Sequence, residues 1–370
     1  MNLSVLCEKV LAGDRLGADE ALVLLEKADV TTLAYLADDV RRRKHPEGIV
    51  SYIIDRNLNP TNVCVTDCGF CSFYATPKDK EKGYVLEREV IYQKIQETVD
   101  VGGVQILMQG GHHPRMGVEW FEDLLRDIAE RWPDLHMHAM SPPEIEHLSK
   151  VSKISTVEVL QRLQKAGMRS MPGGGAEILT EGVRQKIAPR KTDTDTWLRI
   201  MEEAHALGMR TTATMMFGHV ETLADRIEHL DRLRQVQDRT GGFTAFIGWT
   251  FQPLANPLGE QLLATGWQKK TYAEYFRTTA VARIFLDNFD NLQASFVTQG
   301  AEAATMALRA GCNDFGSAML EENVVSSAGC FELVAVDDIE RCIRSVGFEP
   351  RQRNQAYDLL PTAKISAAAH

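Results

Sequence analysis

Apolar and polar residues follow two different periods along most of this chain, and the pattern predicts strands that alternate with helices. From residue 49 onward, short apolar runs are each followed by a longer stretch in which apolar residues recur at helical spacing. Strands are predicted at 50–54 with an extension to 59, and at 104–108, 135–139, 168–171, 210–216, 243–249, 292–296 and 312–315. Helices are predicted at 87–101, 118–131, 156–166, 194–206, 222–239, 272–287 and 301–310.

Regular alternation of strand and helix is typical of parallel βαβ units. Eight candidate strands favour an α/β protein of the closed (β/α)8 barrel type, the TIM-type barrel. An open, doubly wound sheet is the competing architecture. In a barrel, functional side chains gather where the strands end.

The two ends of the chain have different patterns from the middle. Helical spacing at 11–27 and 31–43 predicts an N-terminal helical cap over 1–48, and a turn signal at 45–48 ends it. The barrel is expected over 49–330. The last part, 331–370, is expected to form a helix and an extended arm that pack on the barrel.

Composition narrows the class of protein. The chain has 370 residues, of which 44% are hydrophobic and 25% charged, the balance of a folded globular protein. Its formal net charge of −10 argues against a nucleic-acid partner. No apolar run approaches the roughly 18 residues of a membrane span, and the first residues do not resemble a secretory signal. We therefore expect a cytoplasmic protein without a membrane partner.

The cysteines carry the clearest chemical signal. Three of the seven, Cys64, Cys68 and Cys71, fall in a C-x3-C-x2-C pattern directly after the first predicted strand. Closely spaced thiolates select zinc, copper(I) or iron–sulfur, and structural zinc normally takes four protein ligands. A 4Fe–4S cluster on three cysteines would leave one iron open for chemistry. Zinc with a distant fourth ligand, or three unligated thiols, are the alternatives.

Other loops at strand ends offer contacts for a small ligand. Gly110 and Gly111 follow the second strand and allow a ligand to approach the backbone closely. Glu177 follows three glycines and could reach ribose hydroxyls, and Ser141 after the third strand could reach a ribose or the substrate. Arg190 offers a guanidinium for a carboxylate.

The pattern of cysteines with an aromatic residue before the third, C-x3-C-x-F-C, resembles the signature of the radical S-adenosylmethionine superfamily. The resemblance implies that S-adenosylmethionine binds the open iron of a 4Fe–4S cluster and that Phe70 flanks its adenine. It also places Tyr74 at the cofactor, holds the cofactor's ammonium group at Gly110 and Gly111, and implies an external electron donor of the flavodoxin or ferredoxin type.

Further blocks resemble one branch of this superfamily, which serves futalosine-dependent menaquinone synthesis and deazaflavin synthesis. The similar blocks are 55–64, 109–114, 172–177, 216–219 and 313–316. Within the menaquinone pathway, 249–253 and 321–326 are more similar to the cyclase than to aminofutalosine synthase. The open alternatives are aminofutalosine synthase, another carbon–carbon bond-forming radical enzyme, and a zinc-stapled barrel that only binds a ligand.

The resemblance to the cyclase implies an oxidoreductase reaction on a small nucleoside-derived substrate. Hydrogen is abstracted from C4′ of the ribose of dehypoxanthine futalosine, and the carbon radical then attacks the attached benzoate ring. Candidates for the base that takes the ring proton are Asp314, His219 and Glu221. Expected substrate contacts are His113, Trp249, Gln252 and Asn323.

Overall fold

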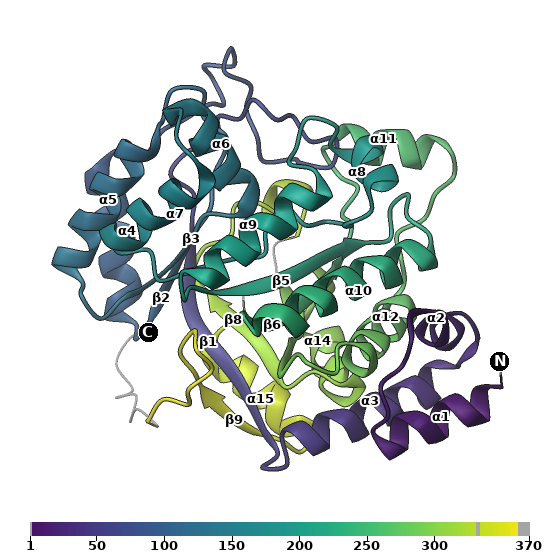
Figure 1. The fold of residues 1–370 in the computed structure, drawn as a ribbon. Helices are drawn as coiled ribbons and strands as arrows, with labels where there is room; N and C mark the ends of the chain where they lie inside the picture. The colour runs from purple at the N-terminus through teal and green to yellow at the C-terminus, as the bar shows by residue number, and fades with distance from the viewer. Residues whose placement is uncertain (1, 331–333, 362–370) are drawn as a thin grey trace.

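Eight parallel strands close into a barrel at the centre of the molecule, with helices around its outside (Figure 1). The computed structural model describes residues 2–330 and 334–361. The sheet order runs from β2 through β8 to β1, and β1 pairs again with β2, which closes the ring. The predicted (β/α)8 barrel is therefore correct, and the open sheet is excluded.

Every predicted strand is present, although several boundaries differ. The seventh is shorter than predicted, and the eighth begins two residues later than predicted and runs four residues further. The eight barrel strands are β1 Ile49–Leu58, β2 Gln105–Met108, β3 His136–Ala139, β4 Ser170–Met171, β5 Arg210–Phe217, β6 Phe243–Thr250, β7 Asn291–Gln293 and β8 Asp314–Met319.

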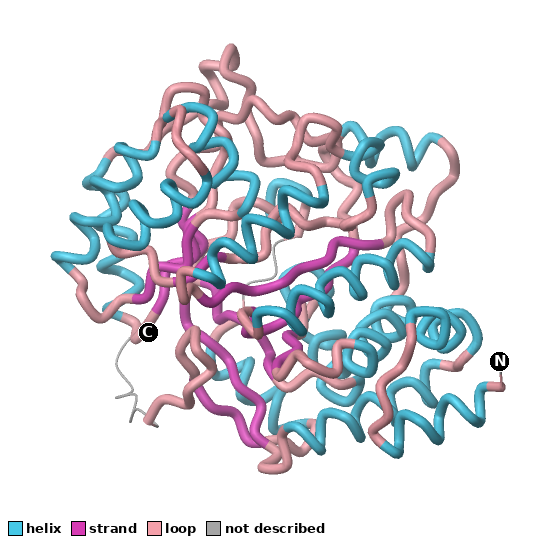
Figure 2. The backbone as a smooth tube through the Cα atoms, in the orientation of Figure 1, coloured by secondary structure: helices cyan, strands magenta, loops and turns pink. Residues whose placement is uncertain are grey.

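Helices follow the strands and pack their apolar faces on the barrel, as the magenta strands inside the cyan helices show in Figure 2. Many begin at a polar residue whose side chain accepts a backbone N–H, as Asp193 and Thr271 do. The helices of the barrel region are α4 Arg88–Asp100, α5 Val118–Arg131, α6 Pro142–Ser152, α7 Thr156–Ala166, α8 Glu181–Ile187, α9 Thr194–Ala206, α10 Leu223–Thr240, α11 Pro257–Ala264, α12 Tyr272–Phe285, α13 Phe296–Gln299 and α14 Ala301–Ala307, with 3-10 turns at Leu308–Ala310 and Ser326–Ala328.

Three helices precede the barrel, where two were predicted. They are α1 Leu3–Ala12, α2 Ala18–Lys27 and α3 Val30–Lys44. The prediction of one helix over 11–27 is wrong because Gly13 ends α1 in a left-handed conformation, with φ at 84°. α3 packs against α12, so the three helices lie on one side of the barrel (Figure 1).

The C-terminal segment forms the helix α15 Val336–Ser345 and the short strand β9 Glu349–Gln352. β9 runs parallel to the first residues of β1 and pairs with them at the end opposite the cysteines. β9 therefore extends the sheet beside β1. The predicted boundary at 331 and the tail from 362 onward lie outside the described residues.

Polar side chains fill the barrel interior below its mouth. Because side chains alternate along a strand, Asp55 shares a face of β1 with Asn59, which lines the mouth. Asp55 accepts hydrogen bonds from Gln105 and Ser317 of the two neighbouring strands. The lower end of the barrel is the end at which its strands begin. There, Arg353 of the C-terminal arm donates to Asp314 at 2.5 and 3.0 Å, and both side chains are buried.

No helix in the part of the chain that the structure describes is long and apolar enough to cross a membrane.

The buried ion pair at the lower end should stabilise the fold. We expect Arg353→Met to lower the free energy of unfolding by roughly 3–5 kcal/mol, since it leaves the Asp314 carboxylate buried without a cation. Urea unfolding followed by circular dichroism measures this change. Arg351→Met is the matched control on β9, because Arg351 makes only a 3.3 Å bond to a backbone carbonyl. Equal stability of the two variants would contradict the expectation.

Candidate active site

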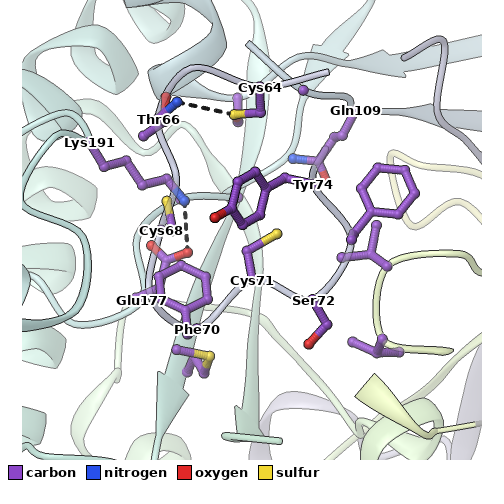
Figure 3. Close-up of a pocket in the computed structure, with 18 of the residues that line it drawn as sticks. Cys64, Thr66, Cys68, Phe70, Cys71, Ser72, Tyr74, Gln109, Glu177 and Lys191 are labelled. Atoms are coloured by element: carbon purple, nitrogen blue, oxygen red, sulfur yellow. Dashed lines mark hydrogen bonds and ion pairs between the residues drawn. The ribbon is translucent and has the colours of Figure 1, made fainter. Parts of the chain in front are cut away.

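A deep pocket opens at the end of the barrel where the strands finish. The space between its walls, including the open mouth, measures about 1250 Å³. Its lining comes from the segments that follow β1, β2, β3, β4, β5, β6 and β8. This is the end at which barrel enzymes carry their active sites. All three cysteines of the triplet line it (Figure 3).

Backbone hydrogen bonds close the cysteine loop and hold it to two other segments. Cys64 N–H donates to the carbonyl of Ala75 at 2.9 Å, which closes the loop on itself. Gly69 donates to Ile187 at the end of α8, and the carbonyl of Gly69 accepts from Leu258 of α11. The loop is therefore positioned by the protein chain itself.

The three sulfur atoms lie around one part of the pocket without converging on a point (Figure 3). Among the described residues, no three His, Cys, Asp or Glu side chains come together closely enough to hold a single metal ion. This spread does not suit a mononuclear zinc site. It does suit a cubane cluster, in which each thiolate binds an iron of its own.

Burial favours the neutral form of two thiols of the loop, Cys68 and Cys71, when they carry no metal. Burial raises the pKa of Cys68 to about 12 and also raises the pKa of Cys71. Metal binding must therefore displace protons from these thiols. The donor set, three thiolates in a pocket with room beside them, fits a 4Fe–4S cluster with one iron open.

The two glycines after β2 lie directly against the cysteine loop. Gly111 N–H donates to the carbonyl of Thr61 at 2.8 Å. A Cβ on Gly111 would lie 2.4 Å from the carbonyl oxygen of Val63. Glycine is required here so that the β2 loop and the cysteine loop can approach one another.

A buried ion pair forms another wall of the pocket. Lys191 Nζ lies 2.9 Å from Glu177 Oε1 and 5.2 Å from the centre of the Phe70 ring (Figure 3). Burial would lower the pKa of Lys191, but the charge of Glu177 and its hydrogen bond outweigh this effect and raise that pKa. Lys191 is thus a fixed cation beside the cysteines.

The structure brings most of the predicted cofactor residues together. Six of the seven line the pocket: Phe70, Tyr74, Gly110, Gly111, Ser141 and Glu177. The seventh, Arg190, is exposed and forms an ion pair with Asp67 outside the lining. The neighbouring Lys191 provides the cation in the pocket. The cofactor roles themselves stay predictions.

Two of the four predicted substrate contacts line the pocket, namely Trp249 and Gln252. His113 does not, and its place is taken by His112, whose Nδ1 lies 2.6 Å from Thr66 Oγ1. Asn323 also lies behind the lining and donates to Asn59, while the next residue, Val324, faces the pocket. In two of the four loops the lining residue is therefore the immediate neighbour of the predicted one, and the substrate roles stay predictions.

None of the three predicted bases lines the pocket. Asp314 was expected at the end of the eighth strand, but it begins β8 and pairs with Ser51. Ser51 lies seven residues before Leu58, the end of β1. At about 3.3 Å per residue, Asp314 therefore lies roughly 20 Å along the strand direction from the mouth of the barrel. Asp314 is instead held by Arg353.

His219 and Glu221 lie one layer behind the wall. Glu221 accepts from the backbone of Gly218 and His219 and pairs with Arg226 at 2.9 Å. Burial lowers the pKa of His219, whose ring packs edge-on against Phe251 of the pocket wall. These partners occupy both groups, so the geometry does not favour either as the base.

The most informative residue that the sequence reasoning missed is Glu144. It lies in the first turn of α6 and lines the pocket beside Ser141. The segment 141–144, Ser-Pro-Pro-Glu, has the form of a helix start. Because it follows a predicted strand, this segment could also have been placed at the mouth of the barrel.

Comparison with known proteins identifies the family. Residues 58–233 match the model of the radical SAM superfamily, and residues 240–366 match that of the CofH/MqnC C-terminal region. The chain is 44% identical to the cyclic dehypoxanthine futalosine synthase of Halalkalibacterium halodurans, over 100% of this chain and 98% of that protein. It is 46% identical to the protein of that name from Streptomyces coelicolor, over 97% and 89%. The chain therefore belongs to the radical SAM superfamily, in the branch with a CofH/MqnC C-terminal region.

A second group of relatives is named for a different activity. The chain is 39% identical to a 5-amino-6-(D-ribitylamino)uracil–L-tyrosine 4-hydroxyphenyl transferase of Methanococcoides burtonii, over 92% of this chain and 94% of that protein. Among solved structures, methylornithine synthase matches with a TM-score of 0.71 at 17% identity, over 93% of this chain and 97% of that one. At this identity the match supports the barrel fold alone.

Membership of the superfamily assigns the cofactors. Radical SAM proteins use a 4Fe–4S cluster and S-adenosylmethionine, and the cysteine loop supplies the three thiolates. Both expected cofactors therefore fit the residues of this pocket.

The contact between Gly111 and the cysteine loop gives a direct test of the site. We expect Gly111→Ala to push Val63 away, to lower the free energy of unfolding by roughly 1–3 kcal/mol, and to reduce bound iron after anaerobic reconstitution. Iron analysis and visible absorbance measure the loss. Gly182→Ala is the control, because a Cβ on Gly182 meets nothing within 4 Å. Full iron loading of Gly111→Ala would contradict the account.

Proposed function

We propose that this radical SAM protein converts dehypoxanthine futalosine into cyclic dehypoxanthine futalosine, in futalosine-dependent menaquinone synthesis. The observation that carries the proposal is the identity of 44–46% to two cyclic dehypoxanthine futalosine synthases over nearly the whole chain. Identity to several 4-hydroxyphenyl transferases is 37–40%. The pocket lies within the part that these relatives share.

The cysteine loop would hold the cluster, and the residues around it would orient the cofactor. When bound, the cluster and S-adenosylmethionine supply an agent that abstracts a hydrogen atom. Lys191, paired with Glu177 beside Phe70, is placed to fix an anionic group of the cofactor. Gly110 and Gly111 leave room for the ligand to lie against the backbone.

The opposite walls suit a nucleoside that carries an aromatic ring. Trp249, Phe251 and Met216 come from the ends of β5 and β6, and Val324, Val325 and Ala328 come from the segment after β8. An apolar enclosure of this kind excludes water from the reacting carbons and holds them close together. Gln252 and Asn59 offer amide groups to the polar parts of the substrate.

The reaction needs electrons from outside the chain. We propose a flavodoxin or ferredoxin as the one-electron donor, and the cytoplasm as the compartment. The small-molecule substrate must find its cation locally, since the whole chain carries a net charge of −10.

Anaerobic turnover with dehypoxanthine futalosine tests the proposed function. With cofactor and reductant present, we expect cyclised product and 5′-deoxyadenosine in parallel. A second reaction offers L-tyrosine with 5-amino-6-(D-ribitylamino)uracil, the pair named for the transferase relatives. Mass spectrometry measures the products. Formation of 5′-deoxyadenosine without cyclised product would reject the substrate, and coupling of the second pair would favour the transferase activity.

Single cysteine variants test the assignment of the cluster. We expect Cys64→Ala, Cys68→Ala and Cys71→Ala each to abolish formation of 5′-deoxyadenosine, because each removes one thiolate of the cluster. Cys7→Ala, on α1 and outside the pocket lining, should keep it. Cofactor cleavage by any of the three triplet variants would contradict the assignment.

A further inference from the structure

The carboxylate of Glu144 lies in the pocket wall at an unusual helix start. Its helix, α6, follows β3 through Met140, which has a φ of 62°. A left-handed conformation is unfavourable for a residue with a side chain and is retained where the surroundings enforce it. Met140 directly precedes the N-cap residue Ser141, and the first turn of α6 lines the pocket.

The hydrogen bonds of Glu144 differ from those of an ordinary helix cap. In a capping box, the glutamate at the third helical position accepts from the backbone of the N-cap residue. Here the hydroxyl of the N-cap residue Ser141 donates to Glu144 Oε2 at 2.6 Å, and Gly110 N–H donates to Oε1 at 2.9 Å. Glu144 therefore bridges the β2 and β3 loops at the pocket wall, and its carboxylate does not cap the helix.

Glu144 also differs from the other carboxylate of the pocket. Glu177 forms an ion pair with Lys191 at 2.9 Å. Glu144 lies within 4 Å of no Lys, Arg or His side-chain nitrogen among the described residues. Its side chain is 8% exposed. It is therefore the carboxylate of the lining that can gain a proton without breaking an ion pair.

The proton affinity of this group suits acid–base chemistry near neutral pH. Burial raises the pKa of Glu144 to about 7, against the opposing effect of the bonds from Ser141 and Gly110. A catalytic base works best when its pKa lies near the working pH.

We propose that Glu144 accepts the proton that the benzoate ring loses during the cyclisation. This inference rests on the proposed function. The C4′–H bond breaks homolytically, and its hydrogen atom goes to the cofactor. A bond then forms between C4′ and a ring carbon. The C–H bond at that carbon breaks, its proton goes to Glu144, and one electron leaves to a one-electron acceptor of the iron–sulfur or flavin class. Loss of one proton and one electron restores the aromatic ring.

Several titratable groups line the same pocket as Glu144. Lys191 and Glu177 lie in the segment after β4, and His112 lies in the β2 loop. Cys64, Cys68, Cys71 and Tyr74 lie in the cysteine loop. The attraction of the Lys191 ammonium lowers the pKa of Glu144. A base must be ionised to accept a proton, so product formation should fall as the pH drops through the pKa of Glu144.

Glu144→Gln tests the proposal, because the amide oxygen of glutamine can still accept from Gly110 N–H and its NH2 group can donate to the Ser141 hydroxyl, but glutamine cannot take the proton. With substrate deuterated at C4′, we expect deuterium still to reach 5′-deoxyadenosine, while cyclised product falls by about 100-fold or more. KM for the substrate should stay unchanged. The fall in the rate of cyclisation at low pH should be absent in Glu144→Gln and present in Glu144→Asp.

A control and a readout independent of turnover complete the test. Glu146→Gln changes a carboxylate on the same helix that pairs with Lys150, outside the pocket lining, and should keep full activity. Infrared difference spectra of the oxidised protein should show a carboxyl band that titrates near pH 7 in the wild type and is missing in Glu144→Gln. This measurement holds even where a variant loads its cluster poorly.

The outcomes separate the two proposals. Wild-type protein that cleaves the cofactor but forms no cyclised product would overturn the proposed function, and this inference with it. Wild-type cyclisation together with undiminished cyclisation by Glu144→Gln would overturn the role of Glu144 alone. Loss of cofactor binding or of deuterium transfer in Glu144→Gln would assign the residue to cofactor binding and would also overturn the proposal.

Discussion

Backbone hydrogen bonds around the loop after β1 hold three cysteines apart at the mouth of the barrel, and the rest of the site is arranged about them. Gly69 exchanges hydrogen bonds with the ends of α8 and α11, two elements more than a hundred residues away in the sequence. Gly111 lies against Val63 with no room for a side chain. Because the buried thiols of Cys68 and Cys71 resist ionisation, binding of the metal has to displace their protons.

The barrel separates two kinds of buried charge. At its lower end, Asp314 and Arg353 neutralise one another and tie the C-terminal arm to the interior. At its mouth, Glu177 and Lys191 form a pair beside the cysteines, while Glu144 is held by a hydroxyl and a backbone N–H. A paired carboxylate is fixed as an anion, whereas an unpaired one can exchange a proton with a ligand. Stability and chemistry are thus served by different carboxylates.

The sequence predicted the architecture and the cysteine site because both depend on short-range patterns. Strand and helix periods and the spacing of the triplet are visible within a few residues of one another. Which of two adjacent residues faces a pocket depends on the irregular backbone of a loop. For this reason the pocket is lined by the neighbours of three predicted residues. Lys191, His112 and Val324 line it in place of Arg190, His113 and Asn323. Asp314 was misplaced because β8 begins two residues later than its apolar run indicates. Glu144 was missed because its segment also has the form of an ordinary helix start.

Electron paramagnetic resonance of the anaerobically reduced protein tests the central claim most directly. The claim is that the three cysteines hold a 4Fe–4S cluster with an iron left open for S-adenosylmethionine. The account predicts the signal of a reduced 4Fe–4S cluster, and a shift of that signal when S-adenosylmethionine is added. A colourless protein with stoichiometric zinc, or a cluster signal that the cofactor does not change, would contradict it.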